Sequence, residues 1–132
     1  MQIGPFTLLP GSLVITKHAP IEEWEKAART LFNLQKHSPW YIADMLNFAE
    51  NQFGEEMWQL VPEDTSESFV SRLLSIGKKY PARDREITLS YTHHQMALRI
   101  RHPQLRRALL LRAANERMDT ENFGRLIKEV SE

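Results

Sequence analysis

The sequence contains no cysteine among its 132 residues and no long apolar run. Without thiols, a disulfide framework, a thiolate metal site and a cysteine nucleophile are all excluded. The longest apolar runs are only a few residues, as in the Ala-Leu-Leu-Leu stretch of residues 108–111, and the first residues lack the basic segment of a secretory signal. We therefore expect a cytoplasmic protein with no membrane contact.

The chain also lacks a net charge, with 17 basic and 17 acidic residues, but the two signs are unevenly distributed. Residues 1–67 hold 4 Lys or Arg against 10 Asp or Glu, whereas residues 68–132 hold 13 against 7. Within residues 71–112 the numbers are 10 and 2, and three histidines add to them. This asymmetry is typical of a polyanion-binding face. The alternative is that the two halves attract one another or a second subunit.

Helix start and stop signals recur along the chain after residue 19. Pro20 is followed by two glutamates in the first turn, and the Ser38-Pro39 pair repeats the start signal. These signals predict an all-α fold, a compact domain of about seven helices. The expected helices run from Pro20 to near Lys36, from Pro39 toward Gly54, over residues 54–61, from a cap at Thr65 or Ser66 to Lys79, from Ser90 to about Arg101, from Pro103 to about Asn115, and from a cap at Asp119 or Thr120 through Val130.

Residues 6–17 differ from the rest, because they contain two short β-prone runs around Pro10 and Gly11. A short extended arm or hairpin over residues 1–19 is therefore expected before a single helical domain over residues 20–132.

The expected helix that begins near Ser66 has two distinct faces. Its apolar residues recur at helical spacing and predict a core stripe of Phe69, Leu73, Ile76 and Tyr80, with Val70 and Leu74 beside them. The opposite face is predicted to be an exposed strip of Ser68, Ser71, Arg72, Ser75, Lys78 and Lys79. Serine is a mediocre helix former, so a strip that merely met water would favour other residues.

Small hydroxyl side chains allow a helix to approach a DNA groove closely and can donate to phosphates or base edges. Arg72 could then bind guanine bidentately, while the basic residues that follow neutralise phosphates. Glu67 either accepts from cytosine N4 or complements the helix dipole. Together with the short helix before it, this segment forms a helix-turn-helix pattern over about residues 54–79, with residues 66–79 as recognition helix.

The segment WYIADMLNFAENQFGEEMWQL, residues 40–60, resembles the signature of lincomycin-cluster type (LmbU-like) helix-turn-helix transcriptional regulators and related phage and plasmid proteins. Ala43 and Ala49 replace glycines of that signature, and Met45 replaces a tryptophan. The matching residues are Trp40, Ile42, Asp44, Leu46, Asn47, Glu50, Gly54 and Glu55.

The similarity continues in residues 21–34 and in the segment REITLSYTHHQMAL, and residues 89–130 resemble the region after the helix-turn-helix in ParB-type partition proteins. The resemblance implies sequence-specific DNA binding and transcriptional regulation through a helix-turn-helix, with no catalysis. No cofactor is expected.

Two further clusters allow more than one interpretation. His93 and His94 diverge by about 100° on a helix, so they are not expected to share a metal ion; we expect one to pack or cap and the other to face the basic surface. Ser90 beside them is interpreted as a cap and not a nucleophile. Asp44 lies between apolar positions, which favours a structural tie to a backbone amide or an arginine over general-acid work.

The arginines at positions 99, 101, 106, 107 and 112 form either a solvated face with salt bridges or a set of phosphate contacts. Trp24, Trp40 and Trp58 lie in apolar stripes and are predicted to be core residues, which disfavours single-stranded nucleic acid as the ligand.

The leading hypothesis is a duplex DNA-binding regulator of transcription, or of phage or plasmid replication and maintenance, which acts as a homodimer. Its acidic N-terminal half could contact RNA polymerase or another protein. The alternatives are a protein interaction module, such as a phage-encoded inhibitor that uses the acidic face against a host DNA-binding protein, and an RNA-binding module. No catalytic or metal site is expected. The expected DNA-binding residues are Ser66, Ser68, Ser71, Arg72, Ser75, Lys78, Lys79, Arg83, Arg85, His93 and His94.

Overall fold

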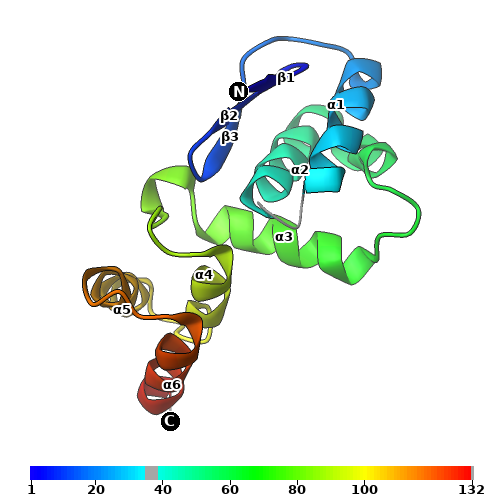
Figure 1. The fold of residues 1–132 in the computed structure, drawn as a ribbon. Coiled ribbons are helices and arrows are strands. Elements are labelled where there is room, and N and C mark those ends of the chain that lie inside the picture. The colour runs from blue at the N-terminus through cyan, green and yellow to red at the C-terminus, as the bar shows by residue number, and fades with distance from the viewer. Residues whose placement is uncertain (35–38, 132) are drawn as a thin grey trace. The chain divides into compact units, whose positions relative to one another are not determined.

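The computed structural model describes residues 1–34 and 39–131, and within them the chain is mostly helical but also contains a sheet (Figure 1). The expected all-α fold of about seven helices is therefore wrong. Three strands come first: β1 (Gln2–Ile3), β2 (Phe6–Leu9) and β3 (Ser12–Ile15). In these described residues six α-helices and two 3-10 helices follow: α1 (Ile21–Leu34), α2 (Pro39–Phe53), η1 (Gly54–Leu60), α3 (Glu67–Lys79), η2 (Ala82–Asp84), α4 (Tyr91–Ala97), α5 (Pro103–Asn115) and α6 (Thr120–Ser131).

The strands form one antiparallel sheet in the order β1-β2-β3. β2 and β3 make the hairpin that was one of the two expected forms of this segment, and Gly11 supplies the positive φ of +74° in its two-residue turn. β1 pairs with β2 through only two residues, Gln2 with Thr7 and Ile3 with Phe6. A strand of two residues shows no alternation, which is why the sequence pattern did not reveal it.

Contacts divide the chain into two compact units, Met1–Ala82 and Arg83–Glu132, called unit 1 and unit 2 below. The sheet belongs to unit 1 with α1, α2, η1 and α3, so this division falls after Ala82, whereas the sequence suggested a boundary at residue 19. Residues 1–82 hold 7 Lys or Arg against 10 Asp or Glu, and residues 83–132 hold 10 against 7.

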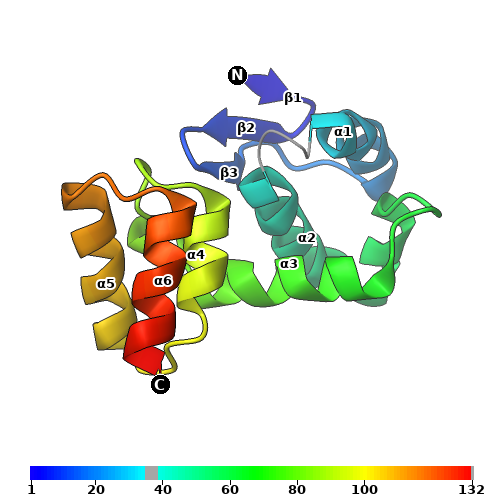
Figure 2. The same cartoon turned by 60° about the horizontal axis from the view of Figure 1, so that its bottom comes forward.

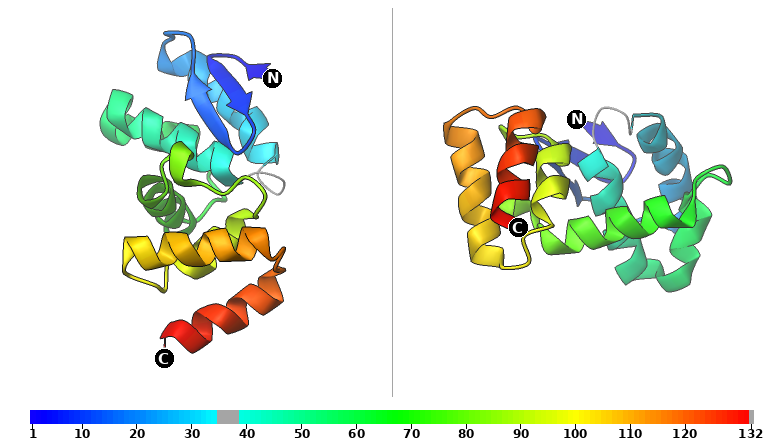
Figure 3. Two further views of the ribbon diagram at one scale, coloured as in Figure 1. Left: turned by 90° about the vertical axis from the view of Figure 1, so that its left-hand side faces the viewer. Right: turned by 90° about the horizontal axis from the view of Figure 1, so that it is seen from below.

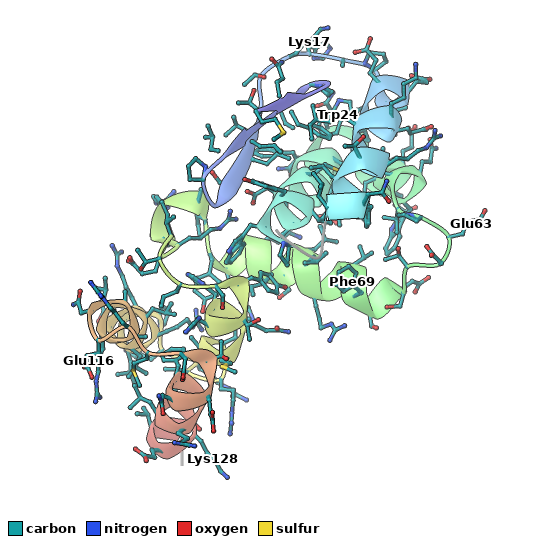
Figure 4. All side chains as sticks on the ribbon, in the orientation of Figure 1. Lys17, Trp24, Glu63, Phe69, Glu116 and Lys128 are labelled. Atoms are coloured by element: carbon teal, nitrogen blue, oxygen red, sulfur yellow. The ribbon has the colours of Figure 1, made fainter. Side chains whose placement is uncertain are left out.

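Trp24 of α1 lies at the centre of the core of unit 1, between the sheet and the helices (Figure 4). Its ring is fully buried and meets Phe6 of β2 and Phe53 of α2 edge-on, with ring centroids 5.2 and 5.1 Å apart. Trp40 is also buried, as expected, and its ring contacts Tyr80. Trp58 of η1 is 41% exposed, so the prediction that all three tryptophans are core residues is wrong for this one.

α2 is the central helix of unit 1, since it contacts α1, β3, η1 and α3. Asp44 of α2 is buried, and its Oδ2 accepts a hydrogen bond of 2.9 Å from the backbone N–H of Leu13 in β3. The hydroxyl of Tyr41 donates to the carbonyl of Leu9 at the edge of the same hairpin. The prediction that Asp44 is a structural tie to a backbone amide is thus confirmed, and the tie attaches the sheet to α2.

The crossing of α2 and α3 depends on a glycine. Gly77 of α3 faces α2, where an added Cβ would lie 2.4 Å from Nδ2 of Asn47. That amide is fixed, because it donates to the carbonyls of Ala43 at 3.0 Å and Leu74 at 3.2 Å. A side chain at position 77 would therefore displace the Asn47 amide and separate the helices.

The helix boundaries follow the caps that the sequence predicted. Ser66 accepts from the N–H of Phe69, Ser90 from that of His93, and Asp119 from that of Asn122. α2 ends at Phe53, and Gly54 follows with a φ of +61°. α4 ends at Ala97 instead of about Arg101. The expected helix end near Lys36 and the expected cap Ser38 lie outside the described residues.

Unit 2 consists of three helices, α4, α5 and α6, which lie side by side (Figures 2 and 3). α4 packs against both of the others. Phe123 and Ile127 of α6 are fully buried, and the ring of Phe123 lies 5.5 Å from that of His93. Arg117, which follows the C-cap residue Glu116 of α5, has a φ of +52°, which is left-handed backbone that disfavours side chains with a Cβ.

Gly77→Ala tests the crossing of α2 and α3. We expect this change to lower the free energy of unfolding by about 1–2 kcal/mol, because the overpacking outweighs the gain in helix propensity. In an Asn47→Ala background the same change should instead raise it by about 1 kcal/mol, since the space is then free. Denaturant unfolding of the four proteins measures both effects, and an equal effect in both backgrounds would contradict the packing described here.

Arg117→Gly tests the strained turn. Glycine adopts positive φ without steric cost, so we expect a stabilisation of about 1 kcal/mol by thermal or denaturant unfolding. Arg125→Gly is the matched control, because Arg125 lies within α6 and glycine there should destabilise by about 1 kcal/mol. A loss of stability with Arg117→Gly would rule out strain at this position.

Candidate nucleic-acid interface

α3 presents the expected two faces. Val70, Leu73 and Ile76 are buried, and Tyr80 directly after the helix is buried too, whereas Phe69 is half-buried at the edge (Figure 4). Ser66 caps the helix and is itself exposed. The structure exposes the whole predicted strip: Ser68, Ser71, Arg72, Ser75, Lys78 and Lys79.

The charged groups of this strip differ in how they are engaged. Nζ of Lys78 lies 2.9 Å from Oε1 of Glu50 on α2, so part of its charge is compensated. Arg72 and Lys79 have no ion-pair partner among the residues that the structure describes. Arg72 also borders a shallow hollow at the start of α3 that Thr65, Ser66 and Phe69 help to line. The N-terminal half of the strip therefore offers a free guanidinium beside small hydroxyls.

The segment before α3 differs from a compact helix-turn-helix. The expected first helix, residues 54–61, forms as the 3-10 helix η1, and six residues, Val61 to Ser66, connect it to α3. Compact helix-turn-helix motifs use a turn of about three or four residues. α3 is instead supported mainly by α2, through the Gly77 crossing.

The expected DNA-binding residues after α3 belong to unit 2 and are not all accessible. Arg83 is exposed, but Arg85 is buried, with 8% of its surface accessible. His93 and His94 are buried as well, at 7% and 0%. The prediction that one of the two histidines faces a basic surface is therefore wrong, and neither can contact DNA in this structure.

The two histidines are held by hydrogen bonds on both ring nitrogens. Nδ1 of His93 accepts from the backbone N–H of Ser90, and Nε2 therefore carries the proton and donates to the carbonyl of Met118 at 2.9 Å. His94 has the opposite arrangement: Nε2 accepts from the N–H of Glu86 at 3.0 Å, and Nδ1 donates to the carbonyl of Ser90 at 2.8 Å. The pair thus joins α4 to the segment before it and to the turn between α5 and α6.

Comparison with protein-family models, with curated proteins and with solved structures finds no match for this chain. The resemblance to LmbU-like regulators therefore rests on the residue pattern of this sequence alone. No helix in the described part of the chain is long and apolar enough to cross a membrane. In that same part, no three His, Asp or Glu side chains gather as a metal site would require.

The stability of unit 2 should depend on pH through His94. Burial lowers the pKa of His94 below the usual 6.5, and the nearby positive charge of Arg85 acts in the same direction. His94 therefore binds a proton more readily in the unfolded chain than in the folded one. The free energy of unfolding should be highest above about pH 6.5 and should fall below it, by at most about 1.4 kcal/mol per pH unit.

Denaturant unfolding between about pH 7.5 and 5.5 measures this fall. His94→Gln should flatten the pH dependence whatever its effect on absolute stability, whereas His18→Gln, at an exposed position, should leave it unchanged. An equally steep fall in His94→Gln would assign the effect to another group.

Proposed function

We propose that this protein binds duplex DNA in a sequence-specific manner, with α3 as the recognition helix, and regulates transcription or the replication or maintenance of a phage or plasmid. The observation that carries the proposal is the exposed strip of α3, where small hydroxyl residues surround the free guanidinium of Arg72. A recognition helix contacts base edges with residues of its N-terminal half, and this is the half that carries Ser68, Ser71 and Arg72.

The chemistry of the strip suits a DNA groove. Serine side chains are short, so the backbone of α3 can approach the base edges closely. Each hydroxyl can donate or accept a hydrogen bond. Arginine is the usual partner of guanine, to which it donates two parallel hydrogen bonds. Lys79 at the other end of the helix is available for a phosphate.

The support of α3 is also favourable for recognition. Its buried face and the close approach at Gly77 fix the helix against α2, so the exposed strip is presented by a rigid element. A rigid helix loses little conformational entropy on binding, and more of the contact energy is then available for discrimination. The connection between η1 and α3 is longer than in a compact helix-turn-helix, but it leaves the exposed face of α3 accessible.

The remaining parts of the proposal follow from the family resemblance and the charge distribution. We place the protein in the cytoplasm and expect a homodimer on a partly palindromic site, as is usual for recognition helices of this size. The exposed Glu55 and Glu56 of η1 are available for RNA polymerase or another protein.

A second candidate is supported by Trp58. This side chain is 41% exposed and follows the exposed Glu55 and Glu56, a composition that suits a basic protein partner with an apolar contact. In that case Trp58→Ala should abolish function while Arg72→Ala should be silent. An RNA-binding module would bind hairpin RNA more tightly than duplex DNA.

Arg72→Ala tests the proposed function in an electrophoretic-mobility assay on DNA upstream of the protein's own coding sequence, with random duplex DNA for comparison. We expect the preference for the specific site to fall by about 1–3 kcal/mol, which is roughly a factor of ten to a hundred, because a bidentate base contact is lost. Binding to random duplex should change little.

Arg29→Ala is the matched control, since Arg29 is an exposed arginine on α1 and its removal changes the net charge equally. If Arg72→Ala and Arg29→Ala behave alike, α3 does not read DNA. A protein that binds no duplex even at low salt would refute the proposal altogether.

A further inference from the structure

The middle of unit 2 contains a long segment without acidic residues. Residues 87–115 include five arginines and no Asp or Glu. The segment covers α4, α5 and the connection between them, residues 98–102, which we call the arginine loop. Arg99 and Arg101 lie in this loop, and both are exposed.

The backbone of the arginine loop is fixed by hydrogen bonds. The N–H groups of Leu98, Arg99 and Ile100 donate to carbonyls at the end of α4, at 3.2, 3.3 and 3.0 Å. Arg106 of α5 reaches back and donates through Nε to the carbonyl of Ile100 at 3.0 Å. The loop is thus ordered before any ligand binds, which reduces the entropic cost of binding.

The two exposed arginines of the loop are not neutralised. The side chains of Arg99 and Arg101 form no ion pair with any residue that the structure describes. By contrast, Arg107 lies 3.7 Å from Asp84, and Arg112 lies 2.9 Å from Glu116. The uncompensated positive charge of this segment is therefore concentrated in the loop.

Three of the acidic residues of unit 2 lie at a different place. Glu116, Asp119 and Glu121 surround the turn between α5 and α6. The bond from His93 to Met118 places that turn at the N-terminal end of α4, whereas the arginine loop follows its C-terminal end. The seven residues of α4 separate the two by about 10 Å.

We infer that the arginine loop is a second nucleic-acid contact, which binds the phosphate backbone of the duplex regardless of sequence. The inference rests on the proposed function, because it takes duplex DNA as the ligand. The two contacts have different tasks: α3 discriminates between DNA sequences, and the arginine loop adds affinity for any duplex. Guanidinium groups suit this task because they remain charged and donate two hydrogen bonds to one phosphate.

The test uses the full chain and random-sequence duplex DNA over a salt series, for instance from about 50 to 200 mM. In Arg99→Gln/Arg101→Gln, two phosphate contacts are lost, so the slope of log K against log salt should become shallower by about 1.8. Arg99→Lys/Arg101→Lys should keep most of the slope. Lys17→Gln/Lys26→Gln is the matched control, because it removes the same charge from exposed positions of unit 1 and should leave the slope unchanged.

The outcomes separate this inference from the proposed function. An unchanged slope in Arg99→Gln/Arg101→Gln, or an equal change in the control, overturns the role of the arginine loop, even if Arg72→Ala loses site preference. A shallower slope together with an unaffected site preference in Arg72→Ala supports the loop and refutes α3 as the reader. Absence of duplex binding at low salt overturns both, and tighter binding to hairpin RNA than to duplex DNA assigns the loop to RNA.

Discussion

The close approach of α2 and α3 is the constraint on which the rest of unit 1 depends. It requires Gly77 on one helix and the bonded amide of Asn47 on the other, and it holds the exposed strip of α3 in place. α2 also holds the sheet through Asp44, and Phe53 near its end closes the aromatic cluster around Trp24. One helix therefore positions the core, the sheet and the candidate recognition surface, which explains why seven of its residues are buried.

In unit 2, buried polar side chains help to hold the helices together. Its first helix, α4, has only seven residues, and two adjacent histidines in opposite tautomers connect α4 to the segment before it and to the turn after α5. Buried imidazoles can do this only when both nitrogens are paired, as they are here. His93 and His94 are therefore structural residues of the interior, whereas Arg99 and Arg101 of the arginine loop lie at the surface.

Local signals predicted most helices, because a cap or a proline determines a helix start within a few residues. Ser66, Ser90 and Pro103 begin helices as expected, and the exposed strip of α3 follows from periodicity alone. β1 could not be predicted, because a strand of two residues shows no alternation. The burial of both His93 and His94 could not be predicted either, because it depends on contacts such as the bond from His93 to Met118, 25 positions along the chain. Trp58 fits an apolar stripe in sequence, but η1 is a 3-10 helix, whose different period turns that side chain outward.

The hydrogen bond between Leu13 and Asp44 spans 31 positions of the chain, and this separation has a consequence for the order of folding. During synthesis β2 and β3 are made before α2, and the helix that holds them ends only at Phe53. An isolated two- or three-stranded sheet of this size is at best marginally stable in water. The sheet is therefore expected to become ordered only as α2 docks, so that these strands are made before α2 but fold no earlier than it does.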